Sequence, residues 1–171
     1  KMSEARPDRV AIGTTSRGIG PCYEDKIGRR GIRMADLIDK DAFPALFNYL
    51  AEDKQTLARA FDIHEAVDFD KVRQQYAEYA ERLRPLVSDT AMLLNNAIRD
   101  GKRVLFEGAQ GTMLDIDHGT FPFVTSSSAT AGGASTGAGV PPTRIDGVLG
   151  VSKAYITRGG AGPFPTEDHG P

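Results

Sequence analysis

Glycine is spread very unevenly along this chain of 171 residues, and this feature most constrains how the chain can fold. Residues 1–100 contain 5 of the 19 glycines, whereas residues 101–171 contain the other 14. Proline divides 4 to 6 over the same two intervals, although the second is shorter. Glycine weakens regular elements and permits turns and close backbone approaches. We therefore expect regular structure first and turn-rich structure afterwards.

The composition is typical of a globular domain and argues against nucleic acid and membranes as partners. Hydrophobic residues make up 40% and charged residues 26% of the chain, which excludes disorder and a disulfide scaffold. The 21 basic and 23 acidic residues give a net charge of −2, so neither nucleic acid nor a membrane is an expected partner. No apolar run reaches the ~18 residues of a membrane span. The single cysteine, Cys22, suits a reducing cytosol, and we expect a cytoplasmic protein.

The first hundred residues predict a series of helices. One begins near Pro21 and ends at Gly31, and another follows Asp41 with apolar residues at helical spacing. A third begins at Asp68 or Asp70 and is broken or kinked at Pro85. A fourth runs from Asp89 to Asp100-Gly101.

The later residues predict an α/β fold. The apolar runs 104–106 and 148–156 are typical of short buried strands. We therefore expect residues 1–101 to form a mostly helical subdomain that includes the Gly-rich loop at 13–30. Residues 102–171 are expected to form a partial α/β core, with strands and Gly-rich loops of an incomplete, mostly parallel sheet. Two strands alone leave edges and faces uncovered, so this sheet is expected to belong to something larger.

Three segments contain residues suited to chemistry. The first, GTTSRGIGPCYEDKIGRR (13–30), combines a Gly-rich loop with a helix start, an arrangement that favours anions. Lys26 and Arg30 share a face of that helix. The segment lacks the GxxxxGK[ST] spacing of a P-loop, and the same composition fits a turn followed by a solvated helix.

The second segment, FEGAQGTMLDIDHGTFPFVTSS (106–127), follows a predicted strand end, where α/β sheets usually place ligands. Gln110 offers a donor and an acceptor to a base, and the hydroxyls that follow suit a phosphate or sugar. Asp115, Asp117 and His118 invite a metal-site interpretation, which would suit a metal-dependent hydrolase. The alternative for this trio is an ordinary Asp-Gly turn.

The third segment, TRGGAGPFPTE (157–167), joins a flexible glycine run to two stiffening prolines. This combination suits a substrate gate and equally suits an ordinary connection.

Together the three segments resemble the middle of the adenylosuccinate synthetase family. The signature GI(G/R)PxYxxKxxR is met in full by residues 18–29, and Gly13-Thr14-Thr15 before it also fits. FEGAQGTxLDIDHGTxPxVTSS is met throughout by residues 106–127, and TRxGxGPFPTE by residues 157–167. The resemblance runs from about Ala11 to Glu167.

The resemblance implies a purine-biosynthesis ligase that joins inosine monophosphate (IMP) to L-aspartate while consuming GTP with Mg²⁺. The family is thought to move a phosphoryl group from GTP to the 6-oxygen of the base, which the aspartate amine then displaces. Positioning and charge stabilisation carry most of such a reaction. The family acts as a homodimer. The resemblance therefore implies that residues 1–101 are a helical insertion with the nucleotide-phosphate loop and dimer contacts, and that residues 102–171 contain the IMP-binding loops.

Site residues follow from the same resemblance, motif by motif. Thr15 and Thr125 are expected to bind the phosphate of IMP, and Gln110 its purine. Arg29 is expected to reach the phosphate bound by the partner subunit. Lys26 is the active-site lysine of the signature, with an uncertain catalytic role.

Two further expectations qualify this assignment. Gly159 stands where the family commonly has valine near the ribose, so its contact is expected to be through backbone only or lost. The family's opening GDEGKGK-type phosphate loop and its GHNAGHT-like segment do not occur here, so the sequence is expected to be an internal fragment, inactive alone. The alternative is a non-catalytic module for dimerisation or weak phosphate binding.

Overall fold

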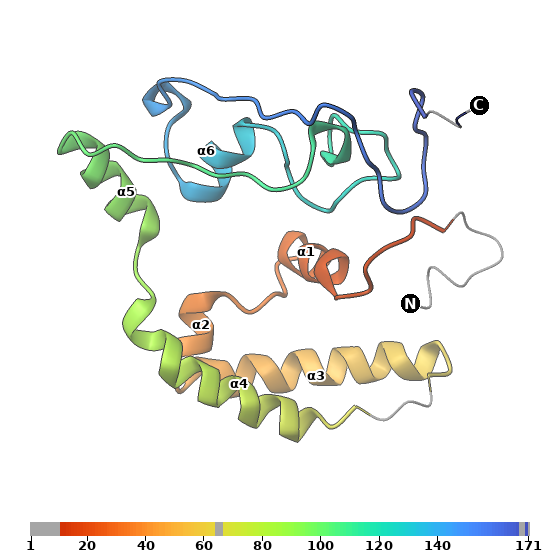
Figure 1. Ribbon diagram of the computed structural model, residues 1–171. Helices are drawn as coiled ribbons and strands as arrows, with labels where there is room; N and C mark the ends of the chain where they lie inside the picture. The colour runs from red at the N-terminus through yellow and green to blue at the C-terminus, as the bar shows by residue number, and fades with distance from the viewer. Residues whose placement is uncertain (1–10, 64–66, 168–169, 171) are drawn as a thin grey trace. The chain divides into compact units, whose positions relative to one another are not determined.

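The computed structural model describes residues 11–63, 67–167 and 170, which belong to two compact units (Figure 1). The helical unit comprises Glu24–Ser88, and the loop unit comprises Lys1–Tyr23 with Asp89–Pro171. The first ten residues, which lack the apolar stretch of a signal peptide, lie outside the described residues. The domain assignment of 1–101 and 102–171 stays a prediction.

The helical unit is a small helix assembly with a short apolar core. Helix α2 packs against both α3 and α4, and α3 lies beside α4 (Figure 1). Phe43 and Ala80 are buried between these helices, and the Phe43 and Phe47 rings lie 5.7 Å apart. The elements are α2 (Met34–Ile38), α3 (Ala42–Ala60), α4 (Phe69–Leu83) and a 3₁₀ turn (Arg84–Leu86).

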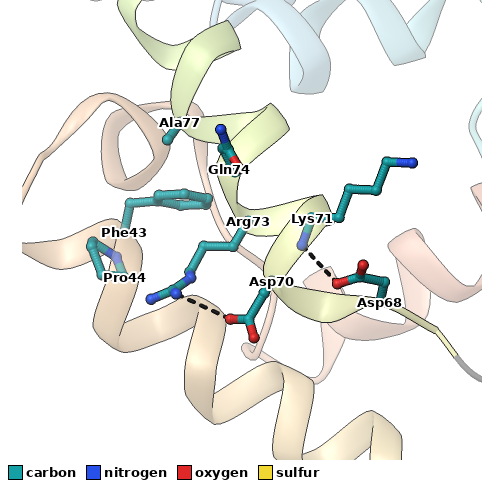
Figure 2. Close-up of a pocket in the computed structure, with 8 residues that line it drawn as sticks. All are labelled: Phe43, Pro44, Asp68, Asp70, Lys71, Arg73, Gln74 and Ala77. Atoms are coloured by element: carbon teal, nitrogen blue, oxygen red, sulfur yellow. Dashed lines mark hydrogen bonds and ion pairs between the residues drawn. The ribbon is translucent and has the colours of Figure 1, made fainter.

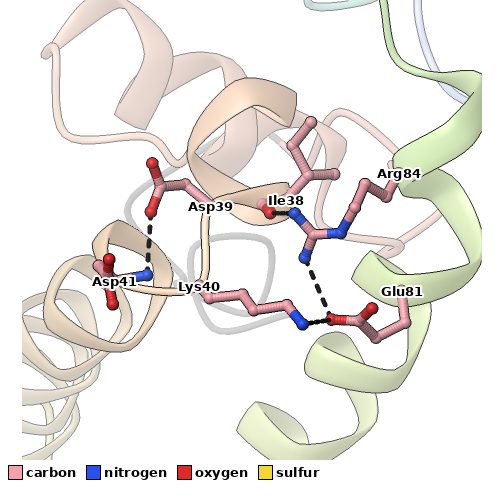
Figure 3. A network of polar contacts seen from close by, with 6 residues as sticks. All are labelled: Ile38, Asp39, Lys40, Asp41, Glu81 and Arg84. Atoms are coloured by element: carbon pink, nitrogen blue, oxygen red, sulfur yellow. Dashed lines mark hydrogen bonds and ion pairs between the residues drawn. The ribbon is translucent and has the colours of Figure 1, made fainter.

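A polar network joins the end of α4 to the link between α2 and α3 (Figure 3). Arg84 donates to the Ile38 carbonyl through Nη1 and to Glu81 Oε1 through Nη2 at 3.1 Å. Lys40 Nζ lies 3.2 Å from the same carboxylate oxygen. These hydrogen bonds from Arg84 and Lys40 lower the pKa of Glu81. The network fixes where the chain turns from α2 into α3.

The predicted helix starts are largely confirmed. The Asp68 side chain accepts from the Lys71 N–H and caps α4, and Asp89 accepts from the Met92 N–H and caps α5 (Thr90–Arg99), each at 2.9 Å. Pro85 lies in the 3₁₀ turn that follows α4.

The start of α3 differs in which side chain caps it. Asp41 is at the N-cap position, but its side chain makes no cap hydrogen bond. Instead Asp39 Oδ1 accepts from the N–H group of Asp41 at 2.9 Å (Figure 3). It also accepts from the N–H group of Ala42 at 2.9 Å. These bonds, that from Ala42 first, lower the pKa of Asp39.

Helix α1 (Ile19–Ile27) ends earlier than the expected Gly31. The Arg30 N–H donates to the Asp25 carbonyl at 2.8 Å, and the Arg29 N–H donates to the Lys26 carbonyl at 3.1 Å. This pair of bonds is a Schellman motif, which places one residue in the left-handed region. That residue is Arg29, with φ 61°, at a position where glycine is usual.

In the loop unit, α5 packs against α6 (Gly132–Ala138), a helix that the sequence reasoning did not expect. A Cβ on Gly139 would lie only 2.6 Å from the Ala91 Cβ, so only glycine permits this approach. Asn95 Nδ2 donates to the Gly139 carbonyl at 3.0 Å. Val140, next in the chain, is buried. Short 3₁₀ turns lie at Thr112–Leu114 and Pro142–Arg144.

The expected α/β class, with strands of an incomplete parallel sheet, is wrong for this structure. The described residues form helices, 3₁₀ turns and loops, and none of them is in a strand. The two apolar runs have a strand-forming sequence, but a strand forms only where a neighbouring strand hydrogen-bonds to its N–H and C=O groups. Here the runs stay unpaired, and Leu105 and Leu149 are each 89% exposed. None of the helices in the described part is long and apolar enough to cross a membrane.

Candidate functional site

The second motif folds into a tight loop closed by backbone hydrogen bonds. The Thr125 N–H donates to the Leu114 carbonyl at 2.8 Å, and the Ile116 N–H donates to the Ser127 carbonyl at 3.2 Å. These bonds lay the hydroxyl segment, residues 125–128, against residues 114–116. A Cβ on Gly119 would overlap the Met113 carbonyl, so the loop closes only around glycine.

Asp115 lies inside this loop, fully buried. Its Oδ1 accepts from the N–H groups of Asp117 at 2.9 Å and His118 at 3.0 Å. Its Oδ2 accepts from the N–H groups of Ala129 at 2.6 Å and Thr130 at 3.0 Å. One carboxylate therefore ties together the beginning and the end of a loop.

The electrostatics of Asp115 follow from these bonds. Burial raises the pKa of the carboxyl, but the four backbone N–H groups together outweigh burial and lower the pKa from 3.8 to about 2. The carboxylate is ionised at neutral pH and its lone pairs are occupied. Asp115 therefore has no acceptor position left for a cation, and the described residues contain no cluster of three or more His, Cys, Asp or Glu side chains that suits a metal. The metal-site interpretation of Asp115, Asp117 and His118 finds no support.

The hydroxyl segment offers donors suited to an anion. Thr125 Oγ1 and Ser127 Oγ lie 3.4 Å apart, both half-buried. Gly20, in the first turn of α1, lies beside the segment, since a Cβ there would be 3.4 Å from Ser126 Oγ. The first turn of a helix presents unpaired N–H groups and a partial positive charge. The first and second motifs thus meet at a place with hydrogen-bond donors from both.

Arg158, in the third motif, reaches the second. Its Nη2 donates to the Phe123 carbonyl at 2.8 Å, and its Nη1 donates to Thr120 Oγ1 at 3.1 Å. The same guanidinium contacts the carbonyls of Ala161 and Pro163, each at 3.3 Å. Arg158 therefore binds its own glycine loop to the loop that holds the hydroxyl segment.

The first and third motifs also lie side by side. A Cβ on Gly13 would lie 3.1 Å from the Ala161 nitrogen and 3.3 Å from the Gly160 Cα. Gly13 has φ 76°, so both its conformation and the space around it require glycine. The start of the first motif, up to Tyr23, and the whole of the second and third motifs thus belong to the loop unit.

The predicted site residues divide between the two units. Thr15, Gln110, Thr125 and Gly159 belong to the loop unit, where all but the half-buried Thr125 are exposed. Gln110 has φ 63°, a left-handed conformation that is uncommon outside glycine.

Lys26 and Arg29 belong to the helical unit and are exposed on and after the last turn of α1. Arg29, like Gln110, is one of four non-glycine residues with positive φ among the described residues. Such outliers concentrate at functional sites.

Two residues that organise the site were missed by sequence reasoning. Asp115 was considered as a metal ligand or as a residue of an ordinary turn, and Arg158 only as part of the third motif. A weak signal existed for Asp115, because Asp before a Gly-containing turn commonly accepts backbone N–H groups nearby. The bonds to Ala129 and Thr130 cross 14 and 15 residues, and no local rule predicts them.

A groove in the helical unit lies away from the predicted site residues. It has a volume of about 690 Å³ and runs between the start of α3 and the start of α4 (Figure 2). The Arg73–Asp70 ion pair and the Lys71–Asp68 cap hydrogen bond flank it (Figure 2). None of the predicted site residues lines it. Its residues are Phe43, Pro44, Asp68, Asp70, Lys71, Arg73, Gln74 and Ala77.

Comparison with known proteins identifies the family. A family model described as adenylosuccinate synthetase matches residues 1–170. The chain belongs to the adenylosuccinate synthetase family. Adenylosuccinate synthetase of Solibacter usitatus is 68% identical over 167 residues, and that of Koribacter versatilis is 60% identical over 167 residues. Each alignment covers 98% of this chain and 38% of the relative.

A solved structure agrees with this family. The structure of fully ligated adenylosuccinate synthetase from Plasmodium falciparum matches with a TM-score of 0.80 and 41% sequence identity. The match covers 90% of this chain and 35% of that one. The chain therefore spans well under half the length of the relatives it matches.

Proposed function

We propose that this chain supplies the IMP-binding loops and a subunit-contact helix to an enzyme that ligates IMP and L-aspartate with GTP. The observation that carries the proposal is the convergence of three family motifs around residues 120–128. Arg158 joins the third motif to the second at 2.8 Å, and Gly20 of the first lies against Ser126. Residues far apart in sequence thus share one donor-rich place.

The phosphate of IMP is proposed to bind at Thr125 and Thr15. A phosphate accepts hydrogen bonds from hydroxyls and from the N–H groups of a helix start. Thr125 Oγ1 lies 3.4 Å from Ser127 Oγ, so two hydroxyls are available on one short segment. The nearby start of α1 adds N–H groups.

Gln110 is proposed to read the purine of IMP. An amide side chain donates and accepts, which matches the N–H and C=O edge of hypoxanthine. Gln110 is exposed and stands in a left-handed turn at the entrance of the loop. Gly159 contributes at most backbone there, because it has no side chain.

Arg29 and Lys26 are proposed to act at the subunit boundary of a homodimer. Arg29 is exposed at the Schellman turn after α1, and a guanidinium binds phosphate with two parallel N–H bonds. In this proposal Arg29 binds the phosphate of the IMP held by the partner subunit, and Lys26 offsets negative phosphate charge in the active site.

GTP and Mg²⁺ are proposed as co-substrate and cofactor on family grounds. The described residues do not fit Mg²⁺, since the buried Asp115 carboxylate is already occupied by four N–H groups. No step is therefore assigned to the ion through these residues. A cytoplasmic location is proposed from the single cysteine and the balanced charge.

The test is steady-state kinetics on a full-length adenylosuccinate synthetase that contains these 171 residues. We expect adenylosuccinate to form only when IMP, GTP and aspartate are all present. Gln110→Ala should raise the KM for IMP at least about tenfold, as expected for a lost polar contact to a base. Gln55→Ala, an exposed glutamine on α3, is the matched control and should leave that KM unchanged. Product formation without IMP, or equal effects of both variants, would refute the proposal.

A further inference from the structure

We infer that Asp115 is a positioning residue for the IMP site: its buried carboxylate holds the backbone of residues 125–128 in the shape that receives the phosphate. The inference rests on the proposed role of Thr125. It assigns Asp115 no contact with substrate and no part in metal binding.

The connection between Asp115 and the hydroxyl segment is direct in the chain. Oδ1 holds the N–H groups of Asp117 and His118 at 2.9 and 3.0 Å, at the start of the loop. Oδ2 holds Ala129 and Thr130 at 2.6 and 3.0 Å, immediately after Ser128. The carboxylate therefore fixes the point at which the hydroxyl segment ends.

The other end of the segment is fixed by the neighbours of Asp115. Leu114 accepts from the Thr125 N–H at 2.8 Å, and Ile116 donates to the Ser127 carbonyl at 3.2 Å. Leu114 and Ile116 thus hold the hydroxyl segment itself, and Asp115 between them holds Ala129 and Thr130 directly after it. Movement of Asp115 would move Thr125 and Ser127 with it.

Only a carboxylate can satisfy this site. An ionised carboxylate provides about four acceptor positions, and four N–H groups fill them here. An amide of the same shape has one acceptor oxygen, and its NH₂ group would face two N–H donors. Because Asp115 is fully buried, those donors would find no water in exchange. The loop would have to shift to relieve them.

A shift of the loop should affect IMP more than the other substrates. A hydrogen bond to phosphate needs a donor–acceptor distance of roughly 2.5–3.2 Å, and a displacement of about 1 Å costs up to roughly 100-fold. Thr125, proposed for the phosphate of IMP, lies on this loop, whereas no described residue is proposed for GTP or aspartate. The expected signature is therefore a selective change in KM.

The experiment uses the full-length enzyme containing these residues, with Asp115→Asn compared against Asp146→Asn, an exposed aspartate of the same unit. We expect Asp115→Asn to raise the KM for IMP at least about tenfold. The KM values for GTP and aspartate should stay within about twofold. Instability alone would lower the amount of folded enzyme, hence the maximal rate, and leave every KM unchanged.

A second variant covers the case in which little Asp115→Asn folds. Asp115→Glu keeps the charge but moves the oxygens by about one C–C bond, about 1.5 Å, and should give an intermediate KM for IMP. An unchanged KM for IMP in both variants, or equal rises for all three substrates, would overturn the inference. If Thr125→Val leaves the KM for IMP unchanged in the wild-type background, the proposed function fails instead.

Discussion

Arg158 Nη2 donates to the Phe123 carbonyl at 2.8 Å, across 35 residues of chain. With Thr120, Ala161 and Pro163 as further acceptors, this guanidinium holds two family motifs together. The arrangement depends on the planar fork of arginine, since a lysine ammonium is a point charge on a flexible stem. Replacing Arg158 therefore tests directly whether its hydrogen bonds hold the loop unit together.

Arg158→Lys should destabilise the 171-residue chain by about 1–3 kcal/mol, the usual cost of losing hydrogen bonds from a charged group. Urea unfolding followed by NMR signals of the loop unit measures this. Arg144→Lys, at an exposed arginine of the same unit, should change stability by less than about 0.5 kcal/mol. Equal midpoints for the two variants would mean that Arg158 does not hold the loops.

Arg29 and Asp62 form a natural comparison, because each occupies a left-handed position after a helix, with φ 61° and 55°. Replacing either with glycine removes the steric cost of that conformation, about 1 kcal/mol, partly offset by the greater freedom of unfolded glycine. Arg29→Gly should therefore leave thermal stability unchanged or slightly raised.

The two glycine variants should differ in function. In the full-length enzyme, Arg29→Gly should raise the KM for IMP roughly tenfold or more, because a charged contact to phosphate is lost. Asp62→Gly should leave it unchanged. If the two variants bind IMP alike, Arg29 does not contact the phosphate.

Gly159 offers a gain-of-function test. A Cβ there meets nothing within 4 Å, and its φ lies outside the left-handed region, so a β-carbon can be added without a clash or backbone strain. Gly159→Val should tighten IMP binding about fivefold, from about 1 kcal/mol of partial burial against the ribose. Calorimetry on the full-length enzyme measures the dissociation constant. Gly150→Val, equally open, is the control, and a matching gain there would rule out a specific contact.

The pKa of Asp115 predicts a pH dependence with a defined sign. Its folded pKa is about 2 and its ordinary value is 3.8, so the folded state releases the proton more readily. The stabilisation from this group is complete above about pH 4 and is lost as the pH falls towards 2. Comparing the urea midpoints of wild type and Asp115→Asn between pH 2 and 6 isolates this effect.

The difference in stability between wild type and Asp115→Asn should be greatest above pH 4 and shrink towards pH 2. Other carboxylates titrate in the same window, but they are common to both proteins and cancel. Asp146→Asn should show no such convergence. A difference that stays constant with pH would contradict a carboxylate held by backbone N–H groups.

Local signals explain which parts of the fold the sequence predicts. Asp68 and Asp89 cap helices with their own side chains, because a capping bond spans only three residues. Asp39 rather than the predicted Asp41 caps α3 with its side chain. The left-handed residue that follows α1 is Arg29 rather than the predicted Gly31, since several residues there satisfy the same local rule. Such helix boundaries depend on which of several possible capping hydrogen bonds forms, and the sequence alone does not show this.

Non-local contacts explain what the sequence does not predict. The runs around Leu105 and Leu149 carry a strand pattern, but a strand needs a partner, and pattern alone cannot supply one. The sequence suggests that Asp115 is a turn residue or a metal ligand. Only the structure shows its bonds to the N–H groups of Ala129 and Thr130. The family motifs predict which residues belong together. Their physical connections through Arg158 and Asp115 come from the structure.

The central claim, that the hydroxyl segment binds the phosphate of IMP, is tested most directly by a cycle of four dissociation constants. Calorimetry measures IMP and inosine, which lacks the phosphate, with the wild-type full-length enzyme and with Thr125→Val. We expect Thr125→Val to leave inosine affinity unchanged and to weaken IMP binding about 10- to 100-fold, the equivalent of a hydrogen bond to a charged group. The same IMP-to-inosine ratio in both proteins would contradict the claim.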